Sequence, residues 1–376
     1  MKQLFKWGIL LVLSIAIAIL IILKFYPDLV QKPIMVELST SEELISDGPY
    51  LFFNGDSVSV EWVENSSKKQ VSILQSKPIH ITRGPNFKFK TAEINSLITK
   101  SESNFNKVQN IAVLSDIHGQ YDLYIELMLA NKLIDKELNW NYKDGHLVII
   151  GDAFDRGDKV NETLWHIIKL SQQASKQGGK VHYLLGNHDV MVLNGDLRYI
   201  HDDYKLTERL LNRPYDELYG TDSWIGQWLR QQPVAIQIND IVFNHAGLSP
   251  ELMRAGLSIN DINTTFAESI IDNKRDSIRA NPDLSLLARS KGPIWYRGYF
   301  RDTTLTTVQV DSVLTHFNAN RIVVGHTSMD KVEHYFDTKV IAADTSIKNG
   351  ENGEILFIEN GQWYRGNLLG ERKLIW

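Results

Sequence analysis

Cysteine is absent from the 376 residues of the chain. Its absence excludes disulfide bonds, a lipid-modified N-terminal cysteine and any metal site that uses thiolate ligands, although it does not identify the cellular compartment. A basic excess is absent as well, since 40 Lys and Arg residues stand against 45 Asp and Glu residues, and the formal net charge is −5. Because no long run of like charge occurs either, we expect no nucleic-acid partner.

Apolar residues make up 43% of the sequence, which is enough for one large domain with or without a smaller appendage. Residues 7–23 contain no charged side chain and are rich in Ile and Leu. This length is at the short end for a membrane span, and Phe25 and Tyr26 extend the segment as an interfacial aromatic belt would. We predict an uncleaved transmembrane helix within residues 1–28, with a cleaved signal peptide as the alternative.

Residues 29–107 have a β-rich pattern. Asn54-Gly55 is a strong turn signal between two alternating segments, 50–53 and 57–63, and shorter segments of the same kind follow. We predict a small N-terminal β-rich appendage to a catalytic domain of residues 108–376. We assign the appendage a structural role, with partner binding as the alternative.

Five short apolar runs in the catalytic domain each end in side chains that bind divalent metals. The side chains that follow the five runs are Asp116 and His118; Asp152, Asp155 and Arg156; Asn187, His188 and Asp189; His245; and His326. In open α/β sheets, functional sites collect beyond the carboxyl ends of strands. One shared site with two metal ions explains all five runs.

Two divalent cations need several oxygen and imidazole ligands, and one carboxylate usually bridges the two. Asp152 is the best candidate for the bridge. Asp116 and His118 would complete the ligands of the first metal, and Asn187, His245 and His326 would complete those of the second. Donors of these types accept Mn, Fe, Zn or Co, of which we favour manganese.

The chemistry also needs an acid and a phosphate clamp. His188 adjoins a proposed ligand, so it can lie beside the metals as a general acid, held by Asp155. Arg156 and Arg297 are candidates for the clamp because a guanidinium makes bidentate contacts with phosphate oxygens. Arg198 is a further candidate for contact with the substrate.

The motifs that contain these residues resemble those of a known family. They are Ser115-Asp-Ile-His-Gly119, Gly151-Asp-Ala-Phe-Asp-Arg-Gly157, Gly186-Asn-His-Asp189, His245-Ala-Gly-Leu-Ser-Pro250 and Gly325-His326. In this order they resemble the phosphoprotein-phosphatase branch of the calcineurin-like metallophosphoesterases, over roughly residues 111–344. Gly195-Asp-Leu-Arg-Tyr199 and Trp295-Tyr-Arg-Gly298 are similar to the bacterial Shewanella-like phosphatase subgroup. The resemblance implies the metal, acid and phosphate roles given above.

Three positions depart from the family pattern. Ser115 replaces a usual glycine, Asp189 replaces the glutamate of the eukaryotic protein phosphatases, and Leu185 stands where an arginine would precede Gly186. The last two changes weaken the expectation of eukaryotic-type specificity for phosphoserine and phosphothreonine. None of the three removes a proposed metal ligand.

The fold expected from these patterns is α/β, a metallophosphatase-type two-sheet β sandwich flanked by helices. Residues 121–133 and 162–176 have helical periodicity after the first two motifs, and several later segments are predicted hairpins. Residues 190–232 are predicted to form a helical cap that contains six Tyr and Trp residues. Those aromatic residues either belong to the core or stack on a substrate ring.

The leading functional hypothesis is a dinuclear-metal phosphomonoesterase, of the serine/threonine/tyrosine protein phosphatase type. Its partner is a phosphorylated protein or a small phosphate ester, with aryl phosphates preferred. A dinucleoside polyphosphate hydrolase is the first alternative, and an inactive cell-surface binding module is the second. Lys2 and Lys6 should remain in the cytoplasm, which places the catalytic domain outside a bacterial inner membrane that the chain crosses once. Signal cleavage would instead give a secreted protein.

Overall fold

The computed structural model describes residues 44–376, of which residues 45–376 form one compact unit. The predicted anchor or signal peptide of residues 1–28 lies outside the described residues. Within the described part of the chain, no helix has the length and apolar character that crossing a membrane requires.

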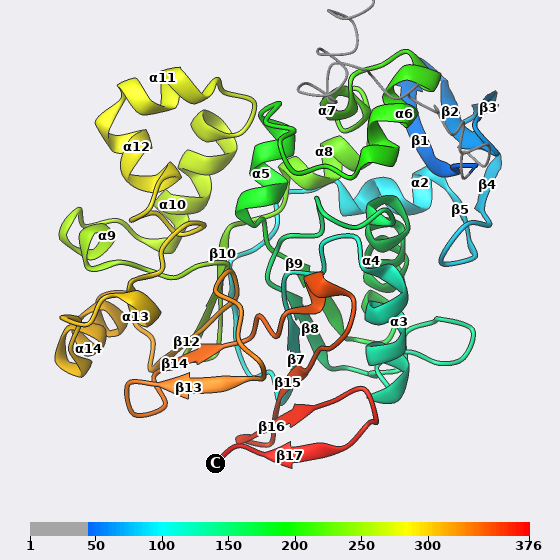
Figure 1. The fold of residues 1–376 in the computed structure, drawn as a ribbon. Coiled ribbons are helices and arrows are strands. Elements are labelled where there is room, and N and C mark those ends of the chain that lie inside the picture. Colours follow the sequence, from blue (N-terminus) through cyan, green and yellow to red (C-terminus); the bar gives the residue numbers. More distant parts are fainter. Residues whose placement is uncertain (1–43) are drawn as a thin grey trace, which may run out of the picture. The chain divides into compact units, whose positions relative to one another are not determined.

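Two six-stranded sheets form the centre of this unit (Figure 1). The first contains, from edge to edge, β17 (Arg372–Leu374), β16 (Gln362–Gly366), β15 (Ile355–Glu359), β7 (Asn110–Leu114), β8 (His146–Ile149) and β9 (Lys180–Tyr183). Strands β7, β8 and β9 are parallel, with Leu114 opposite Ile149 and Ile149 opposite Tyr183, and the other pairs are antiparallel. The three parallel strands therefore end side by side, where the first three motifs begin.

The second sheet brings the remaining two motifs to a common edge. Its strands are β13 (Glu333–Tyr335), β14 (Val340–Ala342), β12 (Arg321–Val324), β11 (Ile241–Asn244), β10 (Ala235–Ile238) and β6 (Asn104–Phe105). Strands β11 and β12 are parallel, with Asn244 opposite Val324, so that His245 and Gly325-His326 follow neighbouring strand ends. A backbone hydrogen bond from Gly325 to the His245 carbonyl (2.8 Å) joins the two ends.

The two sheets pack face to face through alternating apolar side chains. Ile111 and Val113 of β7 belong to the cluster between the sheets, which includes Phe243 and Val323 of the second sheet. Their neighbours on β7, including Leu114, belong to the larger core that the helices cover. This alternation is what a strand buried on both faces requires. The predicted two-sheet sandwich flanked by helices is confirmed.

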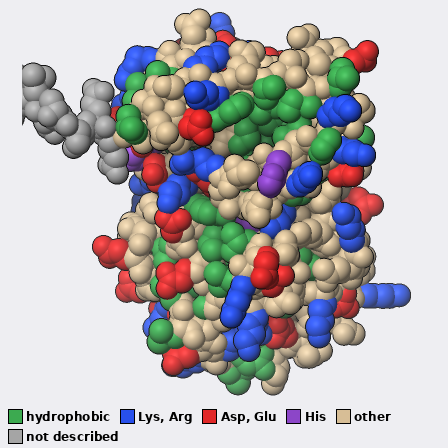
Figure 2. Space-filling view, turned by 90° about the vertical axis from the view of Figure 1, so that its right-hand side faces the viewer, with side chains coloured by type: hydrophobic (Ala, Val, Ile, Leu, Met, Phe, Trp, Pro, Cys, Tyr) green, Lys and Arg blue, Asp and Glu red, His purple; other side chains and the backbone are tan. Residues whose placement is uncertain are grey.

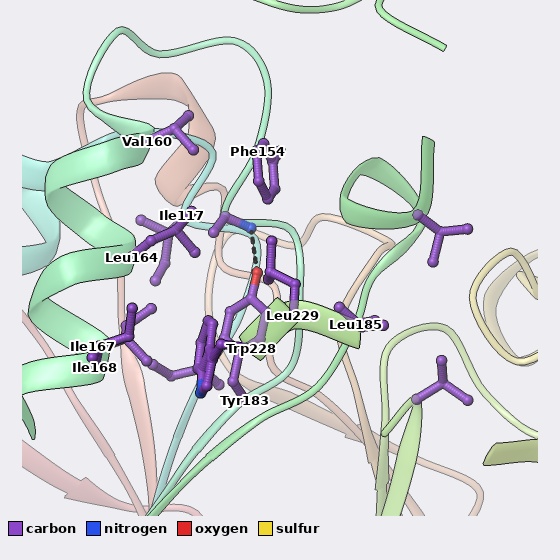
Figure 3. Packing of buried hydrophobic residues seen from close by; sticks show 14 of the residues in the cluster. Ile117, Phe154, Val160, Leu164, Ile167, Ile168, Tyr183, Leu185, Trp228 and Leu229 are labelled. Carbon is purple, nitrogen blue, oxygen red and sulfur yellow. Dashed lines mark hydrogen bonds between the residues drawn. The ribbon is translucent and has the colours of Figure 1, made fainter. Parts of the chain in front are cut away.

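Helices α3 (Tyr121–Ala130) and α4 (Val160–Ser175) follow β7 and β8 and cover the outer face of the first sheet. Figure 3 shows side chains of α4, Leu164, Ile167 and Ile168, packed in the same cluster as Tyr183 and Trp228. Helix α4 ends just before Gly178, whose φ of 81° lies in the left-handed region that favours glycine.

The predicted cap consists of four short helices. They are α5 (Asn187–Leu193), α6 (Asp202–Leu211), α7 (Tyr215–Leu218) and α8 (Trp224–Arg230). The interpretation of its aromatic residues as a substrate platform is wrong for five of the six. Tyr204, Tyr215, Tyr219, Trp224 and Trp228 are buried in the core, whereas Tyr199 is 47% exposed.

A second helical region lies on the side of the second sheet, away from α3 and α4 (Figure 1). Its elements are α9 (Pro250–Arg254), α10 (Ile259–Thr265), the π-helical turn η3 (Phe266–Ile270), α11 (Arg275–Ala280), α12 (Pro282–Ala288), α13 (Gly298–Arg301) and α14 (Thr307–His316). Side-chain caps from Ser249, Ser258, Asn281 and Thr306 begin four of these helices.

The β-rich N-terminal part of the described chain forms two small antiparallel sheets. Their elements are β1 (Asp47–Asn54), β2 (Ser57–Glu64), β3 (Ser67–Leu74), β4 (Pro78–Ile81) and β5 (Phe87–Lys90), followed by α2 (Thr91–Ile94) and η2 (Asn95–Leu97). The predicted hairpin is present, and its two turn residues are Gly55 and Asp56, between the paired residues Asn54 and Ser57. Figure 2 views this side, where hydrophobic side chains gather in the upper part, and Val71 and Leu74 of β3 are among the exposed ones.

Buried polar contacts join these sheets to the rest of the unit. The Asp47 carboxylate accepts hydrogen bonds from the Tyr50 hydroxyl (2.7 Å) and from Thr207 of α6 (2.9 Å). Arg83 forms an ion pair with the buried Glu162 of α4 (2.5 Å). The β-rich segment therefore packs on the cap and on α4 through side chains that are satisfied only when the two are together.

Candidate metal centre

The loops after the strands hold several predicted ligands in a conformation that L-residues rarely adopt. Asp116, His118, Asp152 and His326 have φ values of 54°, 50°, 57° and 63°. Left-handed backbone at such residues costs about 1–2 kcal/mol each, and it persists where the surrounding structure fixes it. Backbone hydrogen bonds provide that fixing here, for example from His118 to the Asp152 carbonyl (2.9 Å). Concentrated strain of this kind is typical of a functional site.

Motif glycines let these loops touch. A Cβ atom on Gly186 would lie 2.1 Å from Asp152 Oδ1, and one on Gly151 would lie 2.4 Å from the Gly186 nitrogen. A Cβ atom on Gly325 would lie 1.9 Å from Ser115 Oγ. Each contact is shorter than any real Cβ contact, so larger residues at these positions would push the ligand loops apart.

Asp152 lies at the centre of the predicted ligands. Its Oδ2 atom is 3.5 Å from His118 Nε2 and 3.3 Å from His245 Nε2, and its Oδ1 atom accepts the backbone N–H of His188 (2.9 Å). Asp152 belongs to two groups of ligand atoms within 4.8 Å of one another, one with His118 and His188 and one with His245 and His326. This is the position that a bridging carboxylate would occupy.

Two imidazoles are oriented by backbone carbonyls. His118 Nδ1 donates to the Phe154 carbonyl (2.6 Å), and His245 Nδ1 donates to the Ile150 carbonyl (2.7 Å). Since a carbonyl can only accept, both rings carry the proton on Nδ1 and direct Nε2 toward Asp152. Histidine ligands are held in this way in metal proteins.

The remaining predicted ligands complete the cluster. Asn187 Oδ1 lies 3.0 Å from His245 Nε2, and Asp116 Oδ1 lies 3.9 Å from His118 Nε2. The buried Nε2 atom of His326 has no hydrogen-bond partner among residues 44–376. A buried, unpartnered imidazole nitrogen beside carboxylates is costly unless a ligand satisfies it. The donor set, all oxygen and imidazole, therefore fits two divalent cations.

The electrostatics of the cluster also fit cations. Burial raises the pKa of Asp116 to about 7, and the charges of Asp344 and Asp152 add to this rise. Burial lowers the pKa of His118 to about 3 and that of His326 to about 2, so both rings are neutral and able to bind metal.

Asp152 and His245 form a buried ion pair at the centre of the cluster, with Oδ2 and Nε2 3.3 Å apart. Burial acts to lower the pKa of His245, but the Asp152 charge and hydrogen bond outweigh it and raise this pKa to about 10. Burial likewise acts to raise the pKa of Asp152, and the charges of His245 and His188 hold it well below its usual range. The Asp152 carboxylate thus remains ionised, and a bound cation would take over the charge of the His245 proton.

His188 and Asp155 form the predicted pair next to the cluster. Their Nδ1 and Oδ2 atoms are 2.5 Å apart, and both side chains are buried. Burial acts to lower the pKa of His188, but the charge of Asp152 and the hydrogen bond of Asp155 outweigh it, so this pKa is raised. The ring of the exposed Tyr199 lies 5.3 Å from the His188 ring.

The three predicted arginines are placed differently. Arg297 is half-buried and donates from Nη1 to the His326 carbonyl (2.9 Å). Arg156 is exposed, and its charge contributes to the low pKa of His118, after burial. Arg198 makes a bidentate ion pair with Asp196 (2.6 and 2.7 Å) and lines a cavity that Asn187 also lines. Only Arg297 touches a proposed ligand residue.

Asp189 has a supporting role that the sequence did not reveal. Its carboxylate accepts four hydrogen bonds, from the backbone of Gly186 (2.7 Å), Asp152 (2.9 Å) and Ala153 (3.1 Å) and from the Tyr183 hydroxyl (2.9 Å). The Tyr183 hydroxyl also lies 3.3 Å from the backbone N–H of Ala153, which donates to it. Asp189 therefore ties the loop of Asn187 to the loop of Asp152.

Ser115 is a second supporting residue. Its hydroxyl lies 2.5 Å from Asp116 Oδ2 and 3.1 Å from the Ile150 carbonyl. Asp116 Oδ2 also accepts the backbone N–H of His326 (3.0 Å). Adjacency to a proposed ligand was the one sequence signal for this role.

The known proteins to which this chain is similar are phosphoesterases and phosphatases. Residues 109–330 match the calcineurin-like phosphoesterase family. A Shewanella-like protein phosphatase 1 of Plasmodium berghei is 28% identical over 287 residues, which cover 71% of this chain and 74% of that protein. A symmetrical bis(5'-nucleosyl)-tetraphosphatase of Vibrio parahaemolyticus is 29% identical over 141 residues, which cover 37% of this chain and 45% of that protein.

A solved structure covers nearly the whole of the described chain. The crystal structure of a cold-active protein-tyrosine phosphatase of a psychrophilic Shewanella species is 39% identical, with a TM-score of 0.83. The match covers 88% of this chain and 100% of that one.

The Asp152→Asn variant tests the centre directly. An amide keeps an acceptor for the His188 N–H but removes the charge that two cations would share, so we expect the variant to lose bound metal. Elemental analysis should find close to two transition-metal equivalents in the metal-loaded wild type and fewer than one in the variant. Asp158→Asn, at an exposed aspartate near the same loop, is the control and should retain both metals. Equal metal content in all three proteins would contradict the assignment.

Proposed function

The chain belongs to the calcineurin-like phosphoesterase family and is a metal-dependent phosphatase of the Shewanella-like kind, and on that premise we propose that it hydrolyses phosphotyrosine and other aryl phosphate monoesters. The observation that carries the proposal is Asp152, which lies between two groups of ligand atoms and beside the His188–Asp155 pair. The proposed metal ligands, the proposed acid His188 and the guanidinium of Arg297 lie close together, as phosphate-ester hydrolysis requires.

We propose the following ligands for two cations. They are Asp116, His118 and Asp152 for the first, and Asp152, Asn187, His245 and His326 for the second. When bound, such ions activate water and neutralise the charge of the phosphoryl group. The carboxylate, amide and imidazole donors accept Mn, Fe, Zn or Co, and manganese remains the metal that we favour among them.

His188 is proposed to protonate the leaving group. Its Nδ1 atom is held by Asp155 at 2.5 Å, which leaves Nε2 to face a substrate. Burial acts to lower the pKa of His188, but the Asp152 charge and the Asp155 hydrogen bond raise it, which favours the protonated ring that a general acid needs. The Asp155 carboxylate orients the ring and stabilises its charged form.

Arg297 and Arg156 are proposed to bind the phosphate. Arg297 is fixed to the loop of His326 through one guanidinium nitrogen, and burial lowers its pKa without removing its charge. The backbone of Arg156 has a φ of 70° and is held by a hydrogen bond from its N–H to the Tyr199 carbonyl (3.0 Å). Its side chain is exposed and free to reach a bound phosphate. Two guanidinium groups suit the doubly charged terminal phosphate of a monoester better than the singly charged phosphate of a diester.

An aryl group is favoured for two reasons. The relative with 39% identity is a protein-tyrosine phosphatase, whereas the tetraphosphatases match little more than a third of the chain. Two aromatic rings also border the site, since Tyr199 lies 5.3 Å from the His188 ring and Trp295 lies 5.8 Å from the His326 ring. These rings can contact an aryl leaving group.

The general-acid role predicts a selective defect in His188→Asn. We expect bound metal to be unchanged and kcat to fall by roughly 10²–10⁴-fold for esters with poor leaving groups. The defect should shrink for nitrophenyl phosphates, whose leaving group needs no proton. His80→Asn, at an exposed histidine of the appendage, should behave as wild type. A defect of equal size for all leaving groups would argue against proton donation by His188.

A substrate panel tests the specificity. On one metal-loaded preparation, kcat/KM should be highest for phosphotyrosine peptides, lower for matched phosphoserine peptides and lowest for a dinucleoside polyphosphate. A tenfold preference for the dinucleotide corresponds to about 1.4 kcal/mol of transition-state stabilisation and would favour the hydrolase alternative. Equal values for the two peptides would remove the aryl preference and leave the monoesterase.

We propose membrane attachment through residues 7–23, on the basis of their uncharged, apolar sequence. The catalytic unit would then lie outside a bacterial inner membrane, as the position of Lys2 and Lys6 indicates. Protease added to spheroplasts should digest the catalytic unit, and N-terminal sequencing of membrane fractions should find the intact start of the chain. A soluble mature form that begins beyond residue 26 would show a cleaved signal peptide instead.

A further inference from the structure

A cavity of about 260 Å³ is lined in part by Asn187, one of the proposed metal ligands. Its walls come from α5 on one side and from η3, α11 and the end of α12 on the other. The inner lining is apolar and largely buried; it consists of Val190, Met191, Ile270, Ile278 and Ile294, with the half-buried Trp295. The cavity therefore adjoins the proposed metal centre at Asn187, and much of its wall comes from the helical region of residues 250–292.

The rim of this cavity is strongly basic. Its charged residues are Arg198, Arg275, Arg279 and Arg289, against Asp196 as the single acidic one, a formal excess of three positive charges. The chain as a whole has a net charge of −5, so the positive charge of the rim is opposite in sign to that of the whole chain. Such a local field attracts anions.

Three of the arginines lack a direct acidic partner within residues 44–376, although the charge of Arg275 helps to lower the pKa of Asp196. Arg198 is paired with Asp196 through two hydrogen bonds, and these lower the pKa of Asp196. Within residues 44–376, the side chains of Arg275, Arg279 and Arg289 form no ion pair and no hydrogen bond, and all three are exposed. Their guanidinium groups are therefore available to bind carboxylate or phosphate oxygens.

We propose that this cavity is a subsite that binds an anionic side chain next to the phosphorylated residue, so that the protein selects acidic phosphopeptides. The inference rests on the proposed function, because it takes the phosphate at the metal centre as its starting point. A peptide whose phosphorylated side chain reaches Asn187 would place flanking residues beside Trp295 and the rim arginines. The recognised group is a carboxylate of Asp or Glu, or a second phosphate.

The test uses three phosphotyrosine peptides that differ at one flanking position, which is Glu, Gln or phosphoserine. Non-hydrolysable phosphonate versions allow affinity to be measured by calorimetry on the metal-loaded full chain, independently of turnover. We expect the Glu peptide to bind about tenfold more tightly than the Gln peptide, since two exposed charge contacts that each contribute about threefold multiply to about tenfold. Tighter binding of the phosphoserine peptide would identify a second phosphate as the preferred anion.

Variants locate the effect. Arg275→Gln and Arg279→Gln should each reduce the ratio of Glu to Gln affinity by about threefold, and the double variant should bring it near one. Arg209→Gln, which removes an exposed arginine outside the cavity, should leave the ratio unchanged. Raising the NaCl concentration should lower the wild-type ratio, because salt screens exposed charges.

Two results would overturn the subsite: equal affinity for the Glu and Gln peptides, or a preference that the double variant retains. Hydrolysis of p-nitrophenyl phosphate, which has no second anionic group, reports separately on the proposed function. If that ester is hydrolysed while the peptides bind equally, the subsite fails and the phosphatase assignment stands. If the ester is not hydrolysed, the proposed function fails, and the affinity ratio still decides whether an anion subsite exists.

Discussion

The buried charge of Asp152 is the constraint on which the rest of the site depends. Its side chain is 1% exposed, and burial of a carboxylate is costly unless positive or hydrogen-bonding groups surround it. His118, His188 and His245 are placed to do so, and each comes from a different strand end. The two sheets must therefore be joined in correct register before this one charge is compensated, which couples the site to the whole sandwich.

Backbone strain at the site follows from the same constraint. Six residues of the proposed site have left-handed backbone, namely Asp116, His118, Asp152, Asp155, Arg156 and His326. Short parallel strands end abruptly there, and the chain must turn at once to direct a side chain inward. Asp189 stabilises the turn at Asp152 by accepting its backbone N–H group, and it also accepts the N–H group of Gly186 in the neighbouring loop. The glycines provide the space, since Gly151 and Gly186 are in contact. Rigid ligands placed in this way need little reorganisation when a cation binds.

The sequence alone could predict the proposed metal ligands, because these are recognised by residue type at the ends of strands. The clustering of Asp116, His118, Asp152, His245 and His326 follows from apolar runs that end in ligands, and the two-sheet fold follows from the mixture of hairpins and βα units. The supporting roles of Ser115 and Asp189 could not be predicted, because they depend on which backbone groups lie near their oxygens after folding. Aromatic spacing in residues 190–232 could not distinguish core from surface, and most of those rings are buried. The role of Arg198 in substrate contact remains a prediction, and in the structure its charge is paired with Asp196.

The division between chemistry and selectivity has a structural origin. All proposed ligands and the acid follow strand ends of the two central sheets, or begin α5, where the sandwich fixes them. The cavity beyond Asn187 is built instead from α5 and from short helices of residues 250–292, whose exposed side chains are free to change without affecting the ligand loops. Phosphate-ester hydrolysis can thus be common to a whole family, while the charge and shape of the helical wall differ between its members. In this chain that wall combines an apolar interior with three arginines that form no ion pair among the described residues. Such a wall suits a peptide in which an acidic residue neighbours the phosphorylated one.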